Sequence, residues 1–192
     1  MNAILLPPAH KPPPAASIHD TPPCPFEQPP WGLEQKALVT GVLKAIQPVD
    51  ASQLWPIATA DAGIAYRPKS LLALLTYCYA MGILGSQDIE HSLEGDPLFR
   101  LLCNNEFPNW HAIRRFRRIN RHALHHTLHA ACLNALQQPT PCGLQPCPLL
   151  ANAIHPWPPG EPSRSQALSR QLAALIDHLL EKAVWLDSVN LD

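Results

Sequence analysis

Residues 70–84 read SLLALLTYCYAMGIL, a stretch without a charged side chain that is apolar on nearly every side of a helix. Such a helix packs against neighbours on several sides. Pro68 suits its first turn, so we expect a helix from Lys69 to about Leu84 that is stopped by Gly85. About 18 apolar residues can cross a bilayer, but this stretch contains serine, threonine, tyrosine and glycine and has no basic flank on one side only. We therefore predict a buried core helix and no contact with a membrane.

Amphipathic segments on both sides of this stretch predict further helices. Apolar residues recur at helical spacing in five more segments, at about 33–48, 87–93, 97–102, 110–137 and 168–184. Ser86, Asp96 and Asn109 stand where helix N-caps are expected, and Asp50 or Ser52 suits a short capped turn. No segment has the pattern of a strand. We predict an all-α fold with a helix-turn-helix-like arrangement, because short helices and turns lead into a basic helix.

Proline divides the chain into segments. Of the 23 prolines, 18 lie in residues 7–30 and 139–162. Proline removes a backbone donor and disfavours helix at the residue before it. We therefore expect a proline-rich, disordered leader over 1–32, one helical domain over 33–137, a proline-rich linker over 138–163 and a C-terminal amphipathic helix over 164–192.

Composition bears on where the protein is located and on how it could attract an anionic partner. The chain has 192 residues and a formal net charge of −1, so attraction to an anionic partner must come from a local cluster of charge. It has six cysteines but no recognisable export signal, because the apolar stretch at 3–6 is too short and runs into proline. We expect a cytoplasmic protein with reduced thiols.

A basic stripe lies on the predicted helix that begins at Trp110. Its members, with no acidic residue among them, are Arg114, Arg115, Arg117, Arg118 and Arg121. The planar guanidinium gives two parallel charge-assisted hydrogen bonds to phosphate, and Ile113 and Phe116 would point inward to pack the helix. The stripe predicts DNA contact, with a merely solvated helix face as the alternative.

Histidines, cysteines and aromatic residues suggest other sites. His122 and His126, like His125 and His129, are four residues apart and precede Cys132, Cys142 and Cys147, which raises the alternative of a zinc site. We expect no metal, because the ligands would have to converge across a proline-rich stretch. Base stacking is an alternative for four aromatic residues that we expect to fill the core: Trp55, Tyr77, Tyr79 and Trp110.

The run from 49 to 120 carries two motifs in order. The first has Tyr66, Pro68, Leu71, Leu72, Leu74, Leu75, Tyr77, Gly82, Ile83, Ser86, Ile89 and Glu90. The second has Asp96, Phe99, Arg100, Leu101, Pro108, Asn109, His111, Ile113, Arg115, Phe116, Arg117 and Arg118. With this spacing, somewhat over a third of the chain resembles the N-terminal domain of DDE-type bacterial insertion-sequence transposases. Departures include Asn109 and Ala112, where the family usually has Asp and Thr or Ser.

The resemblance implies a DNA-binding domain that recognises terminal inverted repeats, and His111 joins the five arginines as a predicted DNA contact. In that family three carboxylates of a later domain hold the metals for catalysis. No such set can be placed after Arg118, so we expect no enzymatic activity, no cofactor, and a truncated or frameshifted transposase. Besides DNA, the expected partners are a second copy of the chain or a full-length transposase.

A protein-interaction module is the alternative function. The apolar stripe over 168–184 would pair with a partner or with its own copy, while the arginines stay solvated.

Overall fold

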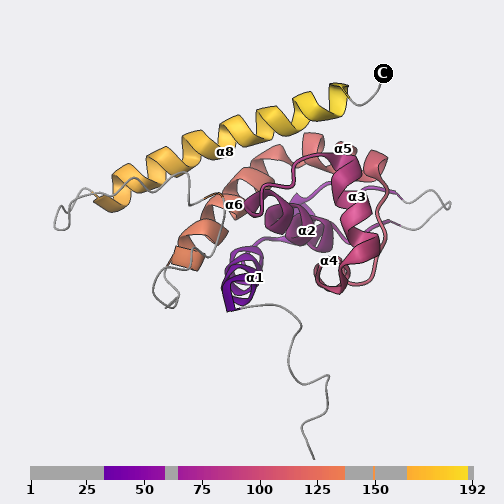
Figure 1. Ribbon diagram of the computed structural model, residues 1–192, viewed down its shortest axis with the longest axis horizontal. Coiled ribbons are helices and arrows are strands. Elements are labelled where there is room, and N and C mark those ends of the chain that lie inside the picture. Colours follow the sequence, from indigo (N-terminus) through magenta and orange to yellow (C-terminus); the bar gives the residue numbers. More distant parts are fainter. Residues whose placement is uncertain (1–32, 59–64, 137–148, 150–163, 190–192) are drawn as a thin grey trace, which may run out of the picture. The chain divides into compact units, whose positions relative to one another are not determined.

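The computed structural model describes residues 33–58, 65–136, 149 and 164–189. These residues form seven α-helices and one 3-10 turn, η1 (Ala51–Gln53). The helices, in chain order in Figure 1, are α1 (Leu33–Ile46), α2 (Pro68–Ala80), α3 (Ser86–Gly95), α4 (Pro97–Leu102), α5 (Trp110–Ile119), α6 (Arg121–Leu136) and α8 (Arg164–Val189). The described residues contain no strand, only an isolated bridge between Ala58 and Ala65. The predicted all-helical class and C-terminal helix are confirmed, whereas the leader and nearly all of the linker lie outside the described residues.

Helix α2 is the centre of the core. All residues from Leu71 to Ala80 are buried, and the helix contacts α1, α4, α5 and α6. The helix ends at Ala80, four residues before the predicted end. Gly82 has a φ of 82°, and the Ile83 and Gly82 amides donate to the carbonyls of Cys78 and Tyr79. A glycine in this left-handed conformation closes a helix by satisfying its last carbonyls, which is why α2 stops early.

Helices α1 and α6 pack closely through Gly41. A Cβ placed on Gly41 would lie 2.8 Å from the Ala131 carbonyl oxygen and 3.3 Å from the Ala135 amide nitrogen. The absent side chain therefore lets the two backbones approach.

The long helix predicted over 110–137 is two helices, α5 and α6, with a break at Asn120. The Asn120 side chain is 4% exposed. Its Oδ1 accepts from the Trp55 amide at 2.9 Å and its Nδ2 donates to the Trp55 carbonyl at 3.1 Å. This pairing with a distant segment accompanies the non-helical backbone of Asn120 (φ −104°, ψ 26°), which the helical periodicity of the sequence does not reveal.

Helix α8 packs along α6, as Figure 1 shows. Its apolar stripe is buried, with Leu172, Ile176 and Ala183 at 0% exposure and Leu180 at 1%. The stripe is thus covered within the chain. No helix in the described ranges combines the length and the apolar character needed to span a membrane.

Candidate nucleic-acid interface

The short helices α3 and α4 precede α5, and both α4 and α5 begin at a side-chain cap. Asp96 ends α3 and also caps α4, with its Oδ1 accepting from the Leu98 amide at 2.8 Å. Asn104 and Asn105 then turn the chain with φ values of 54° and 58°. The Asn109 Oδ1 accepts from the Ala112 amide at 2.9 Å. Both predicted caps are confirmed, and the cap at Asn109 holds the first turn of α5 in place.

One side of α5 packs into the core. Ile113 and Phe116 are 0% exposed, as the sequence predicts. Ala112 is buried beside them, and α5 contacts α2, α3, α6 and α8. This packing fixes which side chains of α5 remain outside.

The opposite side of α5 is basic. His111, Arg115 and Arg118 are exposed, and Arg114 is half-buried. These four residues and Ile119 line a shallow hollow of about 350 Å³. At the start of the helix the imidazole of His111 stacks on Trp110 with ring centroids 3.5 Å apart. Four of the six residues predicted to contact DNA therefore lie together on one surface.

Arg117 does not lie on this surface, and the prediction that it is exposed is wrong. The residue is 1% exposed. It directly follows Phe116 on the packed side of the helix, so its guanidinium points into the protein among α2, α3 and α8. Sequence pattern alone groups it with its neighbours because all five arginines fall within eight positions of one basic segment.

Buried polar partners surround the Arg117 guanidinium. It donates to the Tyr79 hydroxyl at 2.7 Å, the Leu84 carbonyl at 2.9 Å and the Ser86 hydroxyl at 2.8 Å, and it forms an ion pair with Asp187. Burial raises the pKa of Tyr79, so its hydroxyl stays neutral. Arginine keeps its charge in proteins, and a buried charge requires a partner of opposite sign. Asp187, itself 6% exposed, supplies it.

Ser86 belongs to this network and does not cap α3 with its side chain. Gly85 is the N-cap of α3, whereas the Ser86 amide and hydroxyl donate to the Asp187 carboxylate at 3.2 and 3.1 Å. The predicted Ser86 cap is therefore wrong, because a buried ion pair takes its hydroxyl.

Three more polar contacts join α6 to α8. Arg121 lies 3.8 Å from Glu181, and His125 lies 3.5 Å from Asp177. Farther along, His129 Nε2 lies 3.0 Å from the Ser169 hydroxyl. Together with Arg117 and Asp187, these contacts run antiparallel, from 117 to 129 on one side and from 187 to 169 on the other. The sequence analysis did not predict this series of contacts between α6 and α8, although the four-residue spacing of 117, 121, 125 and 129 was a usable signal. Asp177 and Glu181 remain mostly in solvent, with side chains 61% and 68% exposed. We call this series of contacts the ladder.

The histidines of α6 point to different neighbours. His125 and His129 face α8, whereas His122 and His126 are exposed. Within the described ranges, no three or more His, Cys, Asp or Glu residues are grouped so that they could hold a metal ion. Cys142 and Cys147 lie outside these ranges.

The aromatic residues divide as well. Tyr77 and Tyr79 fill the core at 1% and 0% exposure, as predicted, but Trp55 is 67% exposed. The prediction that Trp55 is a core residue is wrong. Its neighbours Leu54 and Ile57 take the buried positions instead, at 4% and 3% exposure.

We compared the chain with protein-family models, curated proteins and solved structures, and no match was found. The resemblance to transposase N-terminal domains thus stays a prediction, supported by the motif residues of this sequence alone.

Proposed function

We propose that this chain binds duplex DNA through the exposed basic side of α5 and has no catalytic activity of its own. The observation that carries the proposal is the grouping of Arg114, Arg115 and Arg118 around one hollow. Among the described residues, none of the three forms an ion pair with a carboxylate. Their charge therefore remains available to an anionic partner.

The geometry of α5 suits a phosphate backbone. His111, Arg115 and Arg118 are spaced at i, i+4 and i+7, which places them along one side of a helix. Guanidinium groups bind phosphate oxygens in pairs and add charge-assisted hydrogen bonds. Backbone contacts of this kind fix the position of a protein on DNA without reading its sequence.

The transposase resemblance extends this proposal. It assigns α3 to α5 to a helix-turn-helix-like reader of terminal inverted repeats, which acts in the cytoplasm with a second copy or a full-length transposase as protein partner.

The interaction-module alternative has less support. It relies on the apolar stripe of α8, but Leu172, Ile176 and Leu180 already pack inside the chain. Trp185 and Val189, at 59% and 49% exposure, are the large apolar side chains that α8 leaves in water.

A salt series tests the DNA-binding proposal. Each neutralised phosphate steepens the fall of log affinity with log salt by about 0.9. Three arginine contacts thus predict a slope near −2.7 for the parent, or a loss of roughly 40-fold between about 50 and 200 mM salt. Replacing Arg115 and Arg118 together by alanine should reduce the slope by about 1.8.

The matched control removes two exposed cations of α8, Arg170 and Lys182, in an Arg170→Ala, Lys182→Ala variant. It changes the net charge equally but should keep the parental slope. The proposal is wrong if the parent shows no salt-dependent binding to duplex DNA, or if both double variants weaken binding to the same extent.

A further inference from the structure

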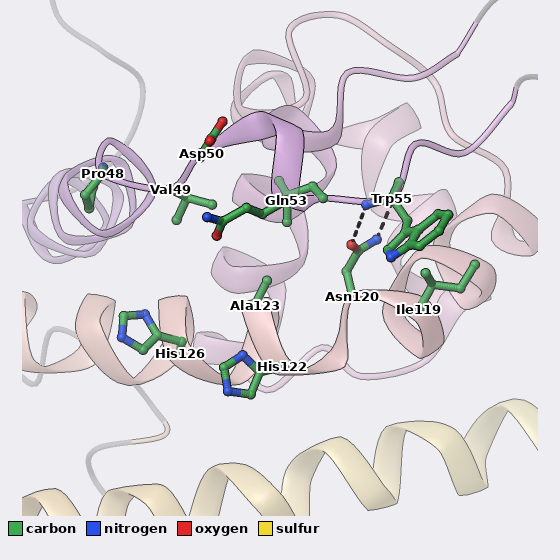
Figure 2. Close-up of a pocket in the computed structure, with 11 residues that line it drawn as sticks. Pro48, Val49, Asp50, Gln53, Trp55, Ile119, Asn120, His122, Ala123 and His126 are labelled. Atoms are coloured by element: carbon green, nitrogen blue, oxygen red, sulfur yellow. Dashed lines mark hydrogen bonds between the residues drawn. The ribbon is translucent and has the colours of Figure 1, made fainter.

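A pocket lies beside the basic side of α5. It has a volume of about 470 Å³ and is bounded by the segment that follows α1 and by the start of α6. Figure 2 shows Val49, Gln53 and Trp55 on one side and His122 and His126 on the helix across from them. Nothing in the DNA-binding proposal above uses this pocket.

Trp55 is held rigidly at the edge of the pocket while its side chain stays in water. The buried Asn120 amide binds both the Trp55 amide and the Trp55 carbonyl, as the dashed lines of Figure 2 mark. Nδ2 of Asn120 also donates to the Phe116 carbonyl at 3.3 Å. Asn120 thus connects the Trp55 backbone to α5. An indole with a fixed backbone loses little further freedom when a flat ring stacks on it.

The pocket adjoins the arginine hollow at Ile119. This residue lines both the pocket and the hollow formed by Arg114, Arg115 and Arg118, and it is 43% exposed. A ligand that spans the two sites meets an aromatic and apolar surface on one side of Ile119 and cationic groups on the other. Nucleotides combine a flat ring and a phosphate in this way.

The charges at the two ends determine how such a ligand is oriented. Asp50 lines the far end of the pocket, and hydrogen bonds from the Ser52 amide and hydroxyl lower the pKa of its carboxyl. The carboxylate remains ionised and repels phosphate, so the phosphate belongs at the arginine end. His122 and His126 offer ring nitrogens to the polar edge of a base.

From this arrangement we propose that the pocket takes one unpaired nucleobase, stacked on Trp55, from DNA whose phosphates lie on Arg115 and Arg118. The inference rests on the proposed DNA binding and adds a preference for duplexes with a single-stranded end or an unpaired base. Stacking of this kind tolerates any base, because every base has a flat face.

Fluorescence anisotropy with two labelled DNAs tests the preference, using a blunt duplex and the same duplex with a short single-stranded overhang. The parent should bind the overhang form about tenfold more tightly, the typical contribution of one stacked base. Trp55→Ala should bind both forms equally, with blunt-duplex affinity unchanged, and Trp55→Phe should restore most of the preference. Trp185→Ala removes another exposed tryptophan, on α8, and should behave like the parent.

The outcomes separate this inference from the proposed function. If the parent binds both DNAs in a salt-dependent way but equally well, or if Trp55→Ala keeps the preference, the pocket inference is wrong while DNA binding by α5 stands. If the parent binds neither DNA, the proposed function fails and the inference fails with it. Circular dichroism melting checks that Trp55→Ala stays folded, as expected for a mostly exposed side chain.

Discussion

Arg117 and Arg118 are neighbours in the sequence, yet their side chains lie in opposite environments. Arg118 is exposed at the edge of the basic hollow, whereas Arg117 is 1% exposed and bound by Tyr79, Ser86 and Asp187. Successive residues of a helix point in directions about 100° apart, so one faces solvent while the next enters the core. Within a cluster of like residues, position on the helix therefore decides which arginine stabilises the fold and which is available to a ligand.

The largest effect should come from breaking the buried pair. Asp187→Ala leaves the Arg117 charge buried without compensation, which typically costs about 3–5 kcal/mol of unfolding free energy. Thermal and urea melts measure this loss. Arg117→Met combined with Asp187→Leu should recover most of it, because apolar residues of similar volume replace a buried ion pair at little cost. A melt of Asp187→Ala that coincides with the parent would show that the pair contributes no stability.

Much of the fold could be predicted from the sequence, because local rules govern it. The caps at Asp96 and Asn109, the proline at the start of α2 and the apolar stripes all follow from residue type and spacing. The break at Asn120 and the burial of Arg117 could not be predicted in this way. Each depends on a partner distant in sequence, Trp55 in the first case and Asp187 in the second.

For the candidate site, the basic helix and its inward residues Ile113 and Phe116 were predicted correctly. The set of arginines on its exposed side was not, because Arg117 is buried. Periodicity locates the apolar side of α5. It does not show whether an arginine next to that side enters the core or stays in solvent. The pocket at Trp55 was missed for a similar reason. The alternation of Leu54, Trp55 and Ile57 does not indicate which of the three is left in water.

A smaller loss of unfolding free energy should follow from removing the N-cap of α5, which holds the first turn of the basic helix in place. Asn109→Ala removes the side-chain bond to the Ala112 amide and should cost about 1 kcal/mol. Asn109→Asp should keep the stability of the parent, since aspartate caps equally well and its charge favours the helix N-terminus. Urea unfolding of the three proteins measures the difference. Equal stability of Asn109→Ala and the parent would mean that core packing alone fixes α5.

The smallest effect should come from the exposed ion pair between Glu181, on the same helix as Asp187, and Arg121 of α6. Glu181 lies 3.8 Å from Arg121, with the two side chains 68% and 46% exposed. Solvent-exposed pairs contribute about 0.2–1 kcal/mol, so Glu181→Ala should change the melt far less than Asp187→Ala. A loss as large as that of Asp187→Ala would mean that the ladder along α8 acts as one cooperative unit.

Chemical modification of arginine tests the division between the two kinds of arginine most directly. The folded protein is treated with an arginine-specific dicarbonyl reagent, with and without saturating duplex DNA at low salt, and each site is quantified by mass spectrometry. Arg115 and Arg118 should react readily without DNA and be protected when DNA is bound, whereas Arg117 should react only after unfolding. Arg117 reacting as fast as Arg118 in the folded protein, or Arg118 staying equally reactive under saturating DNA, would contradict the account.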